Sequence, residues 1–133
     1  MKEPMKIKPE YTSVWRITGM STWDRDFIDL VAPGHLSVKR DGTGIFAFGA
    51  IETEIDCRVE RHAGKEMIAF SFAGWDEGDE VSGRGWAIVE GNSMDGWFGF
   101  HLGDDSTFKA ERKKTKQESN KALKRIAKKP APA

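Results

Sequence analysis

The chain has 133 residues, a length that suits one domain. It carries 21 basic and 21 acidic side chains, so its formal net charge is zero, but the two signs are separated along the sequence. Ten basic and two acidic residues follow position 108, whereas residues 1–108 hold 11 basic and 19 acidic ones. The neutral total therefore combines an acidic body near −8 with a basic tail near +8.

Composition excludes several classes of protein. The longest apolar stretch, IFAFGAI at 45–51, is far shorter than the ~18 residues that a membrane-spanning helix needs. Residues 1–10 carry charge with no apolar core after them, which excludes a secretory signal. The single cysteine, Cys57, cannot form an internal disulfide. These features predict a cytoplasmic protein, and five Trp with eight Phe predict a core rich in aromatic rings.

The chain begins with an arm, a strand and a short helix. Residues 1–10 hold two prolines and three lysines and predict a loose arm. Residues 11–21 alternate, with Trp15 and Ile17 on one face, which indicates a strand. For 22–32 we expect one or two helical turns, capped by Thr22 and stopped by Pro33-Gly34. Its apolar face would consist of Phe27, Leu30 and Val31.

The rest of the chain predicts strands joined by short turns. Asp41-Gly42 is typical of a hairpin turn, and the run from Ile45 to Glu60 is too long for one flat strand, so Gly49 should bend it. Within this run, residues 51–60 alternate between apolar and charged side chains, so one face of the sheet is wet. Residues 76–80 form an acidic loop. The expected strands are 11–21, 35–40, the run 45–60, 67–73, 85–90, 97–102 and 107–112.

About seven to eight strands in this order predict an all-β protein. An antiparallel meander hides its edges most simply by closing into a small β-barrel, and glycines within strands (Gly49, Gly85, Gly99) suit a sheet that bends sharply. One short helix, near 23–32, would plug or cover one end. The domains would be an N-terminal arm (1–10), a barrel (11–112) and a basic, disordered or partly helical tail (113–133). A two-sheet sandwich is the alternative fold.

Two resemblances add to this interpretation. The stretches TGMSTWDRDFIDLV, SGRGWA and FHLGDDS resemble an uncharacterised family of small bacterial cytoplasmic proteins, over about residues 13–112. The layout also resembles lipocalin- and avidin-type (calycin) barrels, in which an Arg of the last strand packs against a Trp of an early strand. Trp15 and Arg112 would hold these positions, although the usual Gly-x-Trp is Ser13-Val14-Trp15 here. The resemblance implies a barrel that binds a small apolar ligand.

Several side chains are candidates for a site at the barrel mouth, and each has a structural alternative. Trp23 and Asp24 could line the mouth, or they could serve only to start the helix. Trp75 borders the acidic loop 76–80, whose spacing does not match a calcium loop and which could instead attract the basic tail. Arg84, between two glycines, could hold an anionic group, although no nucleotide-binding motif is present.

Trp97 and His101 complete the candidate ligand-binding residues. His101 lies near Asp104 and Asp105, a pairing that could act as a general base if His101 faced the barrel interior. Phe98 and Phe100 would then have to face outward. Cys57 lies on the apolar face of its strand, which predicts a buried, unreactive thiol.

The sequence favours a binding module, without catalysis, that recognises a small molecule or a protein partner at its mouth. No catalytic residue, metal site or cofactor is predicted, and no membrane contact is expected. One alternative is a nucleic-acid-associated accessory protein that uses its basic tail, in which Ala122, Leu123, Ile126 and Ala127 form a narrow apolar stripe. Another alternative is a small hydrolase or isomerase that uses His101 with a carboxylate.

Overall fold

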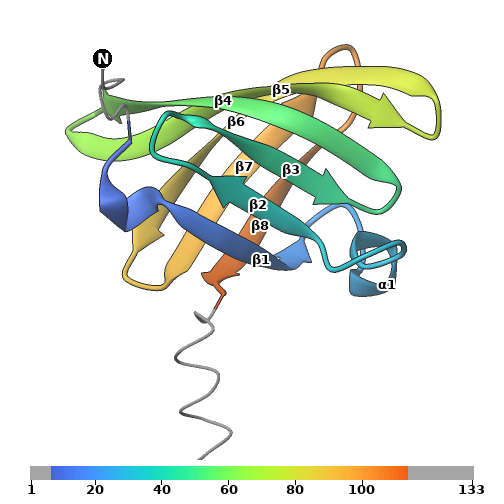
Figure 1. Cartoon of the computed structure of the whole chain (residues 1–133), viewed down its shortest axis with the longest axis horizontal. Coiled ribbons are helices and arrows are strands. Elements are labelled where there is room, and N and C mark those ends of the chain that lie inside the picture. Colours follow the sequence, from blue (N-terminus) through green and yellow to red (C-terminus); the bar gives the residue numbers. More distant parts are fainter. Residues whose placement is uncertain (1–6, 114–133) are drawn as a thin grey trace, which may run out of the picture.

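A computed structural model describes residues 7–113, which form a closed antiparallel β-barrel of eight strands (Figure 1). Each strand pairs with the next, and the last pairs with the first, so the barrel is closed. The all-β meander predicted from the sequence is therefore confirmed, and the sandwich alternative is wrong. The elements are a 3-10 turn (Pro9–Tyr11), β1 (Ser13–Met20), α1 (Arg25–Ile28), β2 (His35–Val38), β3 (Thr43–Phe48), β4 (Ile51–His62), β5 (Lys65–Asp76), β6 (Asp79–Glu90), β7 (Ser93–Phe100) and β8 (Asp105–Arg112).

Strand β4 shows why this sequence forms a barrel wall. Ile51, Thr53, Ile55 and Cys57 are buried, and the charged residues between them are exposed. Because side chains alternate across a strand, the apolar set turns inward and the charged set turns to water. β4 and β5 pair over twelve residues and β6 continues the same wall, so these three strands form the longest part of the barrel.

Several expected strand boundaries differ in the structure; for example, β6 begins at Asp79 and β7 at Ser93, earlier than the expected 85 and 97. The run from Ile45 is two strands, β3 and β4, because Gly49 takes a φ of +60° in the turn between them. A positive φ is easy only for glycine, so the expected bend becomes a full reversal. The expected acidic loop 76–80 is mostly strand: Asp76 pairs with Asp79, and only Glu77 and Gly78 form the turn.

The helix is shorter than the sequence predicts. Only Arg25–Ile28 is helical, and its N-cap is Asp24, whose Oδ1 accepts a hydrogen bond from the backbone N–H of Phe27 at 2.9 Å. Leu30 and Val31 are exposed, so the expected apolar face is wrong there, and Ile28 is the residue that is fully buried. Asp29 is the C-cap, where the backbone leaves the helical conformation, and its Oδ1 accepts a hydrogen bond from the N–H of Gly34 at 3.0 Å.

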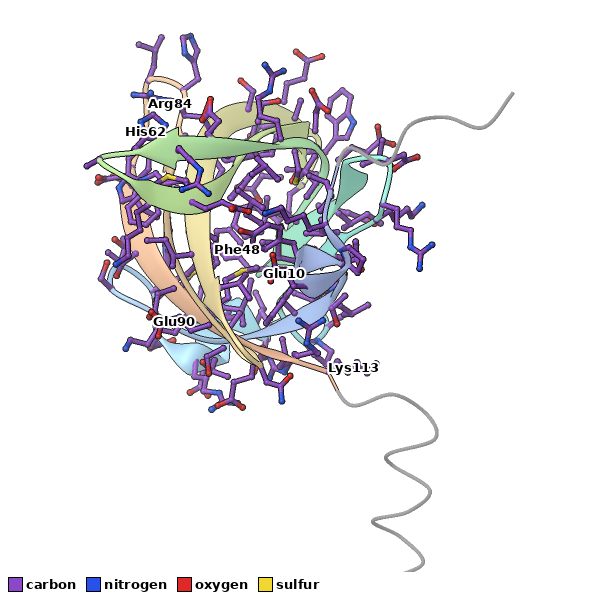
Figure 2. The ribbon with its side chains drawn as sticks, turned by 90° about the vertical axis from the view of Figure 1, so that its left-hand side faces the viewer. Glu10, Phe48, His62, Arg84, Glu90 and Lys113 are labelled. Atoms are coloured by element: carbon purple, nitrogen blue, oxygen red, sulfur yellow. The ribbon has the colours of Figure 1, made fainter. Side chains whose placement is uncertain are left out.

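Aromatic rings fill the interior. Around Phe46, the ring centroids of Phe98, Phe72 and Phe48 lie at 4.9, 5.3 and 5.4 Å, and all four side chains are at most 2% exposed. Phe48 lies inside the ring of strands when the barrel is viewed along its length (Figure 2). Gly85 makes room for this packing, because a Cβ there would lie 2.5 Å from the ring of Phe70. The centre of the barrel is therefore a packed core.

The two ends of the barrel differ. At one end Ile7 is buried, and the hydroxyl of Tyr11 donates a 2.7 Å bond to Glu66; we call this the closed end. At the other end lie α1 and three turns, at 49–50, 77–78 and 101–104; we call this end the mouth (Figure 1). β8 runs from the mouth to the closed end, so the chain leaves the barrel on the side away from α1. Within the described range, no helix has the length and apolar character to span a membrane.

Candidate functional site

The mouth contains a pocket of about 420 Å³, which we call the mouth pocket. Its apolar lining comes from four parts of the chain: the α1 segment, the start of β4, the β5–β6 hairpin and the end of β7. The floor is Trp23, a half-buried side chain that stacks on Phe98 and on Phe27, with centroids at 6.0 and 5.9 Å. The remaining apolar lining residues are Ile51, Val81 and Phe100.

Trp23 is held in place from both sides. Before it, the Thr22 hydroxyl donates a 2.6 Å bond to the carbonyl of Asp105, and the Thr22 backbone N–H donates to the buried hydroxyl of Ser106 at 3.1 Å. After it, Asp24 caps α1. Thr22 thus ties the segment to β8 instead of capping the helix as expected. The indole is therefore positioned over the core before any ligand arrives.

The rim of the mouth pocket is acidic. Asp76 and Glu80 come from the β5–β6 hairpin, and Asp104 comes from the β7–β8 turn. Within residues 7–113, no salt bridge joins any of these three carboxylates to a basic side chain. Four further acids (Asp24, Asp26, Glu77 and Asp79) lie at the same end of the barrel. Carboxylates gathered around a low-dielectric pocket attract cations and repel anions.

His101 lies on this rim but outside the barrel. Phe98, on the opposite face of β7, is fully buried, so the aromatic face of this strand is the inner one and the His101 side chain is exposed. Its backbone N–H donates to the carbonyl of Ser82 at 2.7 Å. Among the described residues, no hydrogen bond connects its ring with a carboxylate. The His101 ring is therefore not oriented by a carboxylate of residues 7–113 in this structure.

Arg84 and Trp97 lie in a second hollow on the outside of β4–β7, a groove of about 840 Å³ that we call the outer groove. The Trp97 indole N–H donates to Asp105 at 3.0 Å, and a Cβ on Gly99 would lie 2.9 Å from its ring, so the ring lies over this glycine. The Cζ of Arg84 lies 5.9 Å from the Trp97 centroid. Arg84 projects outward from the barrel in Figure 2. The outer groove shares Ser82, Phe100, His101 and Gly103 with the mouth pocket.

The structure therefore divides the six predicted site residues. Trp23 and His101 line the mouth pocket, Arg84, Trp97 and His101 line the outer groove, Asp24 is the cap of α1, and Trp75 stands 54% exposed on the outer face of β5. Sequence reasoning missed Phe27 and Phe100 as pocket-lining residues and Asp76, Glu80 and Asp104 as rim residues. The acidic hairpin was a visible signal for two of them. Nothing local indicated that the β7–β8 turn would lie opposite this hairpin, because that proximity depends on barrel closure.

The surroundings of Cys57 determine the reactivity of its thiol. Cys57 is buried, and burial raises the pKa of its thiol to about 12, with a smaller effect from Asp56. A thiol in this state is a poor nucleophile. Among the described residues, no group of three or more His, Cys, Asp or Glu side chains is placed to hold a metal ion.

The closed end carries the Trp–Arg contact that the calycin resemblance implies. The Cζ of Arg112 lies 4.4 Å from the ring centroid of Trp15, which is fully buried. Arg112 also donates to the carbonyl oxygens of Thr12 at 3.0 Å and Glu10 at 2.6 Å.

Fold and site together define a small closed β-barrel with a packed interior and an acidic mouth pocket. Comparison with known proteins finds no match to this chain among protein-family models, curated proteins or solved structures.

Proposed function

We propose that this barrel is a binding protein, without catalysis, whose ligand is a small positively charged molecule with an apolar body. The observation that carries the proposal is the mouth pocket, where a fixed indole, Trp23, forms the floor and Asp76, Glu80 and Asp104 stand on the rim. Ligand sites are typically concave and mostly apolar, with a few polar groups that fix orientation. Here the apolar part of a ligand would contact Trp23, Phe27 and Phe100, and its cation would face the carboxylates.

The packed interior supports the mouth rather than the centre of the barrel as the binding place. A ligand cannot enter the ring cluster around Phe46 without displacing side chains that are buried at core density. The mouth pocket needs no such change, and its rings also offer π faces to a cation. A volume of about 420 Å³ suits a molecule of modest size.

The alternative functions have less support. Residues 7–113 hold 12 basic and 19 acidic side chains, a net charge of −7, so the barrel itself repels phosphate. A nucleic-acid-associated role would thus depend on residues 114–133, outside the described part. The hydrolase or isomerase alternative needs an enclosed His101 paired with a carboxylate, and His101 is exposed.

The proposal also includes kinship with calycin barrels, a bacterial source and a cytoplasmic location. The Trp15–Arg112 contact supports the kinship with calycin barrels. The lone, buried Cys57 supports the cytoplasmic location.

The experiment compares probes of similar shape and opposite charge. Phenethylamine and 3-phenylpropanoate are titrated into the full chain at low salt, and the five indole N–H signals are followed by NMR. We expect the amine to bind at least about tenfold more tightly than the acid and to shift the Trp23 signal most. Trp97 in the outer groove is the internal control. Equal binding of both probes, or shifts confined to Trp97, would overturn the proposal.

Two variants sharpen this test. Glu80→Gln removes one rim charge with little change of shape. It should lower the affinity for phenethylamine several-fold and leave the affinity for 3-phenylpropanoate equal or higher. Glu52→Gln, on the outer face of β4, is the matched control, because Glu52 does not line the mouth pocket. If both variants weaken the amine equally, overall charge rather than the rim determines its binding.

A further inference from the structure

We infer that the basic segment 114–133 of this chain is itself a ligand of the mouth pocket, docking there with its residues 121–129 on its own barrel. The inference rests on the proposed function, because it assigns an occupant to the same acidic, apolar pocket. It makes the mouth a self-occupied site, which an external cation must compete to enter. Three features of the molecule carry it: charge, reach and apolar complementarity.

Charge complementarity is the first feature. Residues 114–133 hold seven basic side chains and one acidic one, and residues 7–113 have a net charge of −7. This negative charge is not spread evenly. Seven carboxylates at the mouth lack a basic partner among the described residues, whereas the acids of the closed end lie among Lys8, Lys39, Arg61 and Lys65. The mouth is therefore the favoured target for the basic segment, even though the segment starts at the other end.

Reach is the second feature. The chain leaves the barrel at the closed end, where the N–H of Lys113 donates to the carbonyl of Val14 at 2.8 Å. Returning to the mouth means running along the outside for a strand's length, about 25 Å beside β8 and about 40 Å beside β6. Residues 121–129 follow Lys113 by 8 to 16 positions, so an extended chain carries them about 26 to 55 Å. Residues 121–129, the most basic part of the segment, are therefore far enough along the chain to reach the rim of the mouth pocket.

Apolar complementarity is the third feature. Leu123 and Ile126 are the largest apolar side chains of the segment and stand three residues apart between lysines. The mouth pocket offers the apolar side chains of Trp23, Phe27 and Phe100 and the carboxylates of its rim. The apolar side chains of the segment would therefore meet apolar rings while its basic side chains meet carboxylates. One such side chain fits the volume of about 420 Å³. Because the segment is tethered, even a weak contact acts at an effective concentration near the millimolar range.

The outer groove is a less suitable acceptor. Its lining mixes both signs: Arg84 lies against Trp97 and pairs across the strands with Ser71, and the carboxylates of Glu54, Asp56 and Asp105 line the same groove. A lysine-rich segment placed there would meet the Arg84 guanidinium in the lining of the groove. The mouth pocket has no Lys or Arg in its lining. The two hollows are adjacent, so the difference in charge decides between them.

The test uses the full chain with a nitroxide attached at Ala127→Cys. Cys57 is buried and does not compete for the label. We expect strong broadening of the Trp23 indole N–H signal at low salt, unchanged on tenfold dilution and lost in high salt, where charges beyond about 3 Å are screened. The outer-groove tryptophan, Trp97, should broaden less. Broadening of Trp97 instead of Trp23, or no broadening, overturns the inference. Broadening that fades on dilution also overturns it, because the occupant would then be the segment of a second copy.

Competition supplies an independent readout. The variant Lys124→Gln, Arg125→Gln, Lys128→Gln should bind phenethylamine several-fold more tightly than the unsubstituted chain at low salt. The control Lys39→Gln, Arg40→Gln, Lys65→Gln removes the same charge from exposed positions at the closed end and should have a smaller effect. Equal effects of the two variants overturn the inference and leave the proposed function intact if Trp23 still shifts. If phenethylamine shifts Trp23 in none of the three proteins, the proposed function itself fails.

Discussion

Replacing Arg112 with alanine should destabilise the barrel far more than the replacement of an exposed basic residue normally does. The guanidinium lies 4.4 Å from the centroid of the buried Trp15 ring and donates to the carbonyl oxygens of Thr12 and Glu10. It thereby ties the end of β8 to the segment that enters β1, across the seam that closes the barrel. The alanine variant loses the cation–π contact and leaves the carbonyl of Thr12 to find another donor.

The size of this effect follows from the separate contacts. A cation–π contact over a desolvated ring contributes about 1–2 kcal/mol, and one part-buried, charge-assisted hydrogen bond contributes about 1 kcal/mol more. The bond to Glu10 is exposed to water and therefore adds little to stability. We therefore expect Arg112→Ala to lower the free energy of unfolding by about 2–3 kcal/mol. Arg112→Lys keeps the charge without the planar fork and should lose about half of that.

Urea unfolding followed by tryptophan fluorescence measures this difference. The control is Lys109→Ala on the same strand, whose side chain is 78% exposed in its ion pair with Asp95 and should change stability by less than about 0.5 kcal/mol. The slope of free energy against urea should stay unchanged in all variants. A loss in Arg112→Ala no larger than that in Lys109→Ala would refute the reasoning that the seam depends on this contact.

Three further predictions concern the core and the closed end. Gly85→Ala places a Cβ against a buried ring and should cost more than about 2 kcal/mol, whereas Gly19→Ala, with nothing within 4 Å, should cost less than about 1 kcal/mol in the same urea assay. Burial, and secondly the hydrogen bond to Glu66, raise the pKa of Tyr11. Tyr11 is the single tyrosine, so absorbance at 295 nm reports its ionisation alone and should show none near pH 10 until the protein unfolds. Because the folded pKa is the higher one, this stabilisation is complete below about pH 10 and is lost as pH rises further. The Cys57 thiol should react with a disulfide reagent at pH 8 only in urea; rapid reaction of the folded protein would contradict its burial.

Much of the fold could be predicted because local patterns suffice for it. Alternation in 51–60 specifies a half-buried strand, and short polar turns specify a meander. Boundaries were harder wherever a distant partner decides them. Asp29 ends the helix early because Arg16, from another element, holds its carboxylate with bonds of 2.7 and 2.8 Å. This pairing lowers the pKa of Asp29 and depends on how the chain folds back across β1.

The candidate site was harder to predict than the fold because it is made of turns that only barrel closure brings together. Trp23 was a candidate from its position at a helix start, and it does line the mouth pocket. Trp97 and Arg84 were assigned to the mouth with it, but the alternation of β6 and β7 places both on the outer face. One additional fact, that Phe98 faces inward, would have separated the candidates of the mouth pocket from those of the outer groove. Alternation fixes relative faces along a strand, and burial is needed to say which face is the inner one.

The separation of charge along the sequence acquires a spatial meaning in this fold. An up-and-down barrel sends each strand the full length of the molecule, so turns at alternate positions gather at one end whatever their distance in sequence. Acidic residues at 24–26, 76–80 and 104–105 therefore combine into one negative mouth, while β8 delivers the start of the basic segment to the opposite end. Opposite charges at the two ends, joined by a segment long enough to return, favour contact within one molecule at low concentration and head-to-tail contact between molecules at high concentration. Ionic strength should weaken both, and dilution only the second, so these two variables distinguish an internally occupied mouth from an assembly of barrels.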